Sequence, residues 1–175
     1  MNVRSQRLAR GLSHILVALL ALCAIGLVIL LPTMIFAYLA PGALPAELST
    51  KVNGVAVDVR QPMVAGTLLL YANVALAAMT TIVVALRRIM QTVVAADPFD
   101  VRNIGRLRLI AWAMAALVAF EALGSLLAPP AVRAQLGLEH GGFNFGMFIG
   151  MLVVLVLAEV FREGARLREE NEGTI

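Results

Sequence analysis

The chain has 175 residues, of which 61% are hydrophobic and only 14% are charged, and its formal net charge is +3. Soluble domains are nearer half apolar and a quarter charged, and a soluble fold of this length has too small a core to bury so much apolar surface. The composition therefore excludes a soluble globular domain and indicates a membrane protein. The single cysteine, Cys23, excludes an intrachain disulfide and a paired-cysteine metal site.

Four apolar stretches are each long enough to cross a bilayer as a helix, which takes about 20 residues. We expect these spans at about 12–39, 64–86, 109–128 and 145–161. The first two carry no charge, whereas the third contains Glu121 and the fourth contains Glu159. The first is longer than the apolar core of a signal peptide, so we expect it to be retained. Because none alternates like a strand, the sequence predicts an all-α membrane protein, a single domain of four transmembrane helices.

The basic residues indicate how these spans are oriented. Three arginines precede the first span, five lie between the second and third, and three follow the fourth. Only Lys51, Arg60 and Arg133 lie elsewhere. The positive-inside rule then places both termini, the hairpin tip 87–108 and the tail 162–175 in the cytoplasm.

The two loops on the other side differ in character. The first, 40–63, contains Asn53-Gly54, a pair typical of a type I′ turn, followed by valines at alternate positions. We expect either a small hairpin on the outer face or an irregular loop there. The second, 129–144, is rich in glycine and proline and is typical of a turn region.

The cytoplasmic side is predicted to be helical beyond the bilayer. The apolar stripe of the second span continues as far as Ala96, so that helix is expected to project from the membrane. Asp97-Pro98 resembles an N-cap followed by proline at the first helical position, which predicts that the next helix starts at Pro98. Charged residues after the fourth span pair at helical spacing, so we expect that helix to end near Gly173.

Two segments of the chain match a known family. The first consists of Asp97-Pro98-Phe99, Asn103, Arg106-Leu107-Arg108, Ile110 and Trp112, and the second runs from Leu157 to Ala165 and on through the tail. Together they resemble the small bacterial four-span inner-membrane proteins of domain-of-unknown-function family 2975, over nearly the whole chain. The resemblance implies an inner-membrane location and no assigned activity. Because members are often encoded beside a small helix-turn-helix regulator of the Cro/CI type, it also implies a DNA-binding protein as partner.

One acidic residue lies deep in a predicted span. A carboxylate in the middle of a helix costs roughly 2.5–3.5 kcal/mol to insert, so Glu121 is expected to face the bundle interior. It could titrate as the ion or proton site of a small transporter or channel subunit. It could instead be a structural acid, hydrogen-bonded to Asn73, Tyr71 or a threonine of the second span. Because no second buried charge accompanies it, the structural interpretation is favoured.

The other candidate site is a cytoplasmic interaction face. We expect the hairpin tip to pack against the helix that follows Glu159 just inside the membrane. Glu159 is expected either to form a helix-end ion pair beside Arg162 or to face Arg106 and Arg108 of the hairpin. The residues predicted to form this face are Asp97, Pro98, Phe99, Asn103, Arg106, Arg108, Glu159, Arg162 and Arg166.

These patterns bound the function. The chain contains no phosphate-binding loop, serine-hydrolase elbow or zinc-protease motif, so we expect neither an enzyme nor a cofactor. Orientation already explains the arginines, so we expect no direct binding of nucleic acid. The first hypothesis is a regulatory or sensory partner of a small cytoplasmic DNA-binding protein, and the alternative is a transporter or channel subunit that uses Glu121. Gly146-x-x-x-Gly150 fits either a monomeric bundle in lipid or a homo-oligomer.

Overall fold

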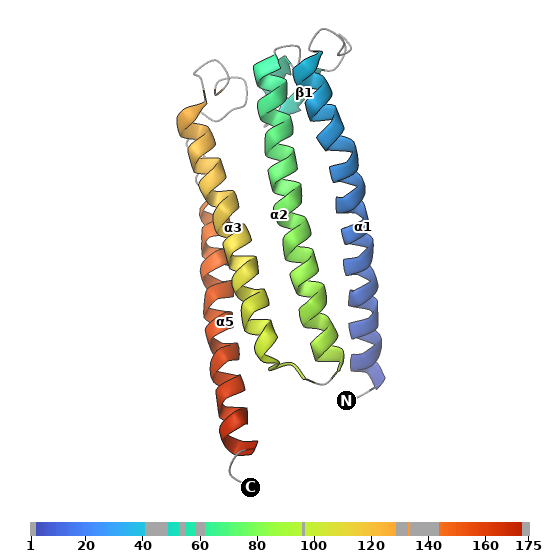
Figure 1. Ribbon diagram of the computed structural model, residues 1–175, viewed down its shortest axis with the longest axis vertical. Coiled ribbons are helices and arrows are strands. Elements are labelled where there is room, and N and C mark those ends of the chain that lie inside the picture. The colour runs from blue at the N-terminus through green and yellow to red at the C-terminus, as the bar shows by residue number, and fades with distance from the viewer. Residues whose placement is uncertain are drawn as a thin grey trace. The chain divides into compact units, whose positions relative to one another are not determined.

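Long helices make up most of the computed structural model (Figure 1). They are α1 (Val3–Leu39), α2 (Pro62–Val94), α3 (Val101–Leu127) and α5 (Phe145–Glu172). The structure describes residues 3–40, 49–52, 55–58, 62–95, 97–128, 133 and 144–172. Within these residues, all four helices contain a stretch long and apolar enough to cross a membrane. The chain is therefore a multi-pass membrane protein with an all-α core, as the composition predicts.

The surface of the helices explains why they need lipid. Many large apolar side chains on all four helices are exposed, among them Val28 in α1, Leu126 in α3 and Val156 in α5. In water such a surface would be an aggregation liability, whereas in a bilayer it contacts acyl chains. The buried side chains are mostly small or medium-sized, such as Ala85, Ala111 and Ala158, which allow close approach of neighbouring helices.

The helix ends agree with the sequence in two places and differ in one. α2 continues past the predicted span to Val94, and α5 continues to Glu172, so the predicted extensions are confirmed. The predicted start of the third helix at Pro98 is wrong, because α3 begins at Val101. Asp100 is the residue that caps it, since its Oδ1 accepts the backbone N–H of Arg102 at 2.8 Å.

The described chain divides into two compact units. Unit 1 comprises Met1–Cys23, Ala78–Ala116 and Phe145–Ile175, and unit 2 comprises Ala24–Ala77 and Leu117–Asn144. Unit 1 contains the connection between α2 and α3 together with α5. Unit 2 contains the remaining parts of α1, α2 and α3.

Unit 2 also contains two short strands. β1 (Ser49–Val52) and β2 (Val55–Asp58) pair antiparallel, with Ser49 opposite Asp58 and Val52 opposite Val55. The predicted Asn53-Gly54 turn between them lies outside the described residues, as does most of the predicted loop 129–144.

Candidate functional site

The connection between α2 and α3 is organised by one buried side chain. Asn103, in the first turn of α3, is completely inaccessible to solvent. Its Nδ2 donates to Thr92 Oγ1 at 2.7 Å and to the Pro98 carbonyl at 2.9 Å. Because Thr92 belongs to α2 and Pro98 to the connection, a single amide ties the end of one helix to the start of the next. The Thr92 hydroxyl in turn donates to the Ile89 carbonyl at 2.7 Å.

The amide oxygen of Asn103 also has a partner, the guanidinium group of Arg106. Asn103 Oδ1 accepts a hydrogen bond from Arg106 Nη1 at 2.7 Å, and the same nitrogen donates to the Arg88 carbonyl at 2.8 Å. Arg106 therefore spans from α3 to α2. A hydrogen bond from a charged donor contributes more than one between neutral groups, so this contact reinforces the Asn103 network.

A second polar cluster lies at the start of α3. The Asp100 carboxylate accepts hydrogen bonds from Arg102 Nη2 at 2.6 Å and from Arg102 Nε at 3.0 Å. These bonds lower the pKa of Asp100 to about 2. The carboxylate is therefore ionised at any physiological pH, as an N-terminal cap should be, because the helix dipole favours negative charge there.

The two segments on which the family resemblance is based meet in unit 1. The ring of Phe99 packs on the ring of Phe161 in α5, with centroids 5.5 Å apart and an interplanar angle of 49°. It also covers Gly164, where an added Cβ would lie only 2.7 Å from Phe99 Cε1. The predicted packing of the hairpin tip against the fourth helix is thus confirmed, and Gly164 is what permits the close approach.

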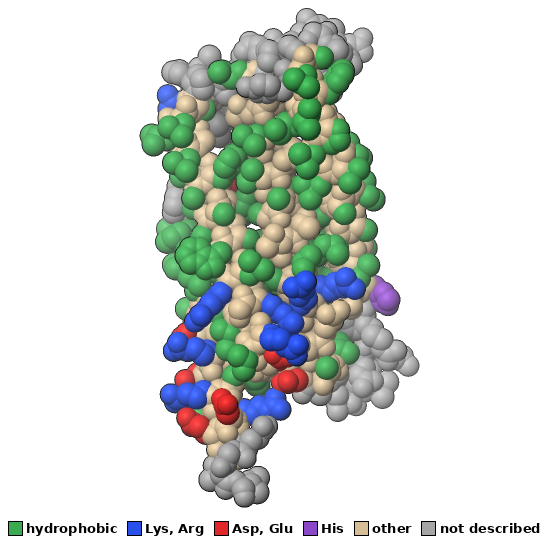
Figure 2. Space-filling model, in the orientation of Figure 1, with side chains coloured by type: hydrophobic (Ala, Val, Ile, Leu, Met, Phe, Trp, Pro, Cys, Tyr) green, Lys and Arg blue, Asp and Glu red, His purple; other side chains and the backbone are tan. Residues whose placement is uncertain are grey.

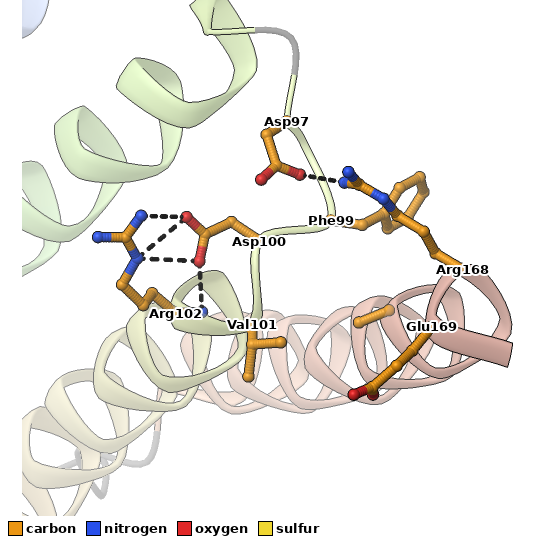
Figure 3. Close-up of a pocket in the computed structure, with 8 residues that line it drawn as sticks. Asp97, Phe99, Asp100, Val101, Arg102, Arg168 and Glu169 are labelled. Atoms are coloured by element: carbon orange, nitrogen blue, oxygen red, sulfur yellow. Dashed lines mark hydrogen bonds and ion pairs between the residues drawn. The ribbon is translucent and has the colours of Figure 1, made fainter. Parts of the chain in front are cut away.

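An ion pair accompanies this contact. Arg168 Nη1 of α5 donates to Asp97 Oδ1 at 2.5 Å, and Figure 3 shows the two side chains turned toward each other above Phe99. Figure 2 shows blue and red side chains gathered around the end of α5 and the α2–α3 connection. The pair lies beside an open groove of about 380 Å³. Its lining residues are Asp97, Phe99, Asp100, Val101, Arg102, Ala165, Arg168 and Glu169.

Of the two arrangements expected for Glu159, the structure contains the helix-end ion pair. Glu159 forms an ion pair with Arg162 of its own helix, so the other arrangement, in which it faces Arg106 and Arg108, is wrong. Helical spacing brings Glu159 and Arg162 onto one face, whereas Arg106 is held by Asn103 and the Arg88 carbonyl. Arg166 pairs along α5 with Glu163 and Glu170, as the helical spacing of these charges predicts.

Sequence reasoning did not single out Thr92 and Gly164 for this site. Thr92 lies on the apolar stripe of α2 and is buried. A polar residue on such a stripe needs a hydrogen-bond partner, and its position in the sequence could have indicated one. Gly164 is a glycine inside a helix, and glycine there costs about 0.5–1 kcal/mol relative to alanine unless close packing requires it.

The intramembrane residues lie in unit 2. The Tyr71 side chain of α2 lies beside the Glu121 carboxyl group of α3. The Tyr71 ring also packs on Phe120, with centroids 5.4 Å apart. Asn73 is buried, and its Nδ2 donates to the Leu69 carbonyl of its own helix at 2.8 Å. Glu121 and Tyr71 are thus neighbours. Asn73 Nδ2 also donates to Met34 Sδ of α1 at 3.8 Å, and among the described residues the buried Asn73 Oδ1 accepts no hydrogen bond.

This geometry is suited to binding and to joining helices. Among the described residues, no group of three or more His, Cys, Asp or Glu side chains could hold a metal ion. Thr92, Asn103 and Arg106 bond one another across the α2–α3 connection, and Asp97, Asp100 and Arg102 line the open groove beside α5.

Comparison with known protein families shows the family to which the chain belongs. The model of the family described as "Protein of unknown function (DUF2975)" matches residues 43–175, and the chain belongs to this family. No curated protein and no solved structure matches it.

Replacing Asn103 by leucine should destabilise the protein, because Thr92, Pro98 and Arg106 all lose their partner in a buried place. We expect the free energy of unfolding to fall by about 2–4 kcal/mol. The measurement is a denaturant titration of the purified protein in mild detergent. The control is Asn171→Leu, since the Asn171 amide bonds only the Leu167 carbonyl on the exposed side of α5. Equal losses in both variants would contradict a special role for Asn103.

Replacing glycine by alanine should have opposite effects at two helical positions. Gly164→Ala forces the Phe99 ring off α5 and should cost about 1–3 kcal/mol of unfolding free energy. Gly105→Ala meets nothing within 4 Å and should stabilise α3 by about 0.5–1 kcal/mol. Trimming the ring, as Phe99→Leu in the Gly164→Ala background, should recover part of the loss. Thermal unfolding in detergent tests all three, and a stabilising Gly164→Ala would refute the packing argument.

Proposed function

We propose that this chain is a bacterial inner-membrane protein with both termini in the cytoplasm, where it binds a small DNA-binding regulator. The observation that carries the proposal is the groove at the start of α3. It combines exposed apolar side chains with a rim of charges of both signs. Protein interfaces are commonly built in this way, with an apolar centre and a polar rim.

The apolar centre of the groove is small but accessible. Val101 is 69% exposed and Phe99 is 40% exposed, although Phe99 already packs on Phe161. Arg168 and Asp97 form the rim on one side, and Arg102 lies on the other. Such a site suits a protein segment with a bulky apolar side chain and charges of either sign. That the partner is a helix-turn-helix regulator is what the family resemblance implies.

The orientation rests on the distribution of arginines. The groove lies at the α2–α3 connection, where five arginines cluster, and α5 ends nearby in a segment with three more. Cytoplasmic loops carry an excess of Lys and Arg, so this end of the protein is the one that a cytoplasmic regulator would meet.

The surroundings of Glu121 favour a structural role for this residue over a role in transport. Its contact with Tyr71 joins α2 to α3, which is a structural role that needs no titration. A transporter or channel subunit that uses Glu121 therefore stays a prediction of lower rank.

The orientation can be tested with single cysteines in a Cys23→Ala background. A membrane-impermeant maleimide should label Ala56→Cys in intact spheroplasts, because the loop 40–63 is expected to face outward. It should label Glu172→Cys only after the membrane is permeabilised, because the end of α5 is expected to lie in the cytoplasm. Labelling of Glu172→Cys in sealed spheroplasts would overturn the proposed orientation.

The partner can be tested with a variant that charges the groove without disturbing the helix. Val101→Glu places a carboxylate in the first turn of α3, where the helix dipole tolerates it, and should reduce recovery of the partner about tenfold or more. Recovery is measured by affinity capture of the full chain in mild detergent with quantitative mass spectrometry.

The matched control is Asn171→Glu, which adds the same charge to exposed α5 outside the groove lining. Support requires that the captured protein is a DNA-binding regulator, that Asn171→Glu retains it, and that deleting the membrane protein alters transcription of the regulator's targets. Recovery of no such regulator, or equal recovery by Val101→Glu, would refute the proposal.

A further inference from the structure

A second groove in unit 1 lies between the ends of α2 and α3. It has a volume of about 290 Å³ and is lined by three arginines, two aspartates and three other residues of the connection. The lining residues are Arg88, Gln91, Thr92, Ala95, Asp97, Asp100, Arg102 and Arg106. Both Arg88 and Arg106 line it, and Arg106 Nη1 donates to the backbone carbonyl of Arg88 at 2.8 Å.

The charges of this groove are only partly neutralised. Asp100 is bound by Arg102, and Asp97 is bound by Arg168 of α5. Among the described residues, neither Arg88 nor Arg106 forms an ion pair with a carboxylate. Within the described part of the chain, Arg106 donates its hydrogen bonds from Nη1, so its Nη2 and Nε are available to a ligand. The groove therefore presents two guanidinium groups to an anion.

The positions of Arg88 and Arg106 along their helices indicate which anion would reach the groove. Arg88 follows the uncharged stretch that runs from Met63 to Leu86 in α2, and Arg106 precedes the uncharged stretch 109–120 in α3. Both therefore lie where neighbouring helices enter the hydrocarbon, which is the level of the lipid headgroups. Trp112, one turn beyond Arg108, is 73% exposed, and an exposed tryptophan near a span end is typical of this interface.

We propose that this groove binds the phosphate of an anionic phospholipid headgroup between Arg88 and Arg106. Guanidinium groups bind phosphate through paired N–H donors, and anionic lipids attract basic residues at the cytoplasmic surface. A zwitterionic headgroup fits less well, because its own ammonium group would oppose the arginines. The bound phosphate joins α2 to α3 from the lipid side. This link is ionic and exposed, whereas the link made by the Asn103 amide is neutral and buried.

The experiment measures the stabilisation of delipidated, full-length protein in detergent by added phosphatidylglycerol, phosphatidylcholine and glycerol 3-phosphate. Phosphatidylglycerol should raise the Tm at concentrations about tenfold lower than phosphatidylcholine. Arg88→Gln should abolish this difference, and Arg88→Lys should keep most of it. The Gln variant retains the backbone carbonyl that Arg106 binds, so the fold should persist.

The matched control is Arg166→Gln, which removes one exposed, ion-paired arginine outside the groove. It should leave the preference for phosphatidylglycerol unchanged. An equal loss in Arg166→Gln would show general attraction of anions to a basic protein and would overturn the site. Stabilisation by glycerol 3-phosphate at the same concentration as by the lipid would overturn the lipid as its source.

Native mass spectrometry gives a second measurement that does not depend on unfolding. Wild-type protein released from an equimolar mixture of phosphatidylcholine and phosphatidylglycerol should retain phosphatidylglycerol preferentially, and Arg88→Gln should not. Equal retention of both lipids by the wild type would overturn the proposal.

Discussion

The amide of Asn103 is the interaction on which the rest of unit 1 depends. The end of a helix leaves carbonyl groups without partners, and the start of the next leaves N–H groups in the same condition. Here the connection is short, and the Asn103 amide satisfies the Pro98 carbonyl and Thr92 while its own oxygen receives Arg106. Because the chain from Arg106 through Asn103 to Thr92 is continuous, its members polarise one another. Replacing any one of them would leave the others unsatisfied in a buried place.

The fixed connection presents Phe99 and Asp97 to α5. Of these two contacts, the ring contributes more. Exposed ion pairs such as Asp97–Arg168 are worth at most about 1 kcal/mol, and both partners here remain about half exposed. An aromatic pair adds about 0.5–1.5 kcal/mol beyond the area that it buries, and Gly164 allows the ring to lie directly on the α5 backbone. We infer that α5 is held by apolar packing and that the ion pair sets its register.

Sequence reasoning succeeded where one physical constraint dominated. The length of the uncharged stretches predicts the four helices, because lipid admits only a helix with all of its backbone groups paired. It failed where two residues offered the same chemistry. Asp97 and Asp100 both have a side chain that can cap a helix, and in the structure Asp100 accepts the backbone N–H of Arg102 while Asp97 pairs with Arg168 of α5. For Glu159 the sequence left two partners open, and the three-residue spacing to Arg162 prevailed over a contact between helices.

The two grooves of unit 1 are not independent, because Asp97, Asp100 and Arg102 line both of them. A protein partner that draws Arg168 away from Asp97 frees a carboxylate at the edge of the groove that contains Arg88 and Arg106. That free charge would weaken the binding of a phosphate there, by repulsion across a short distance. Thermodynamic linkage makes the effect reciprocal, so a bound anionic lipid would equally favour the closed Asp97–Arg168 pair and oppose a partner that must break it. The shared aspartates thus offer a physical route by which the lipid composition of the membrane could act on a partner in the cytoplasm.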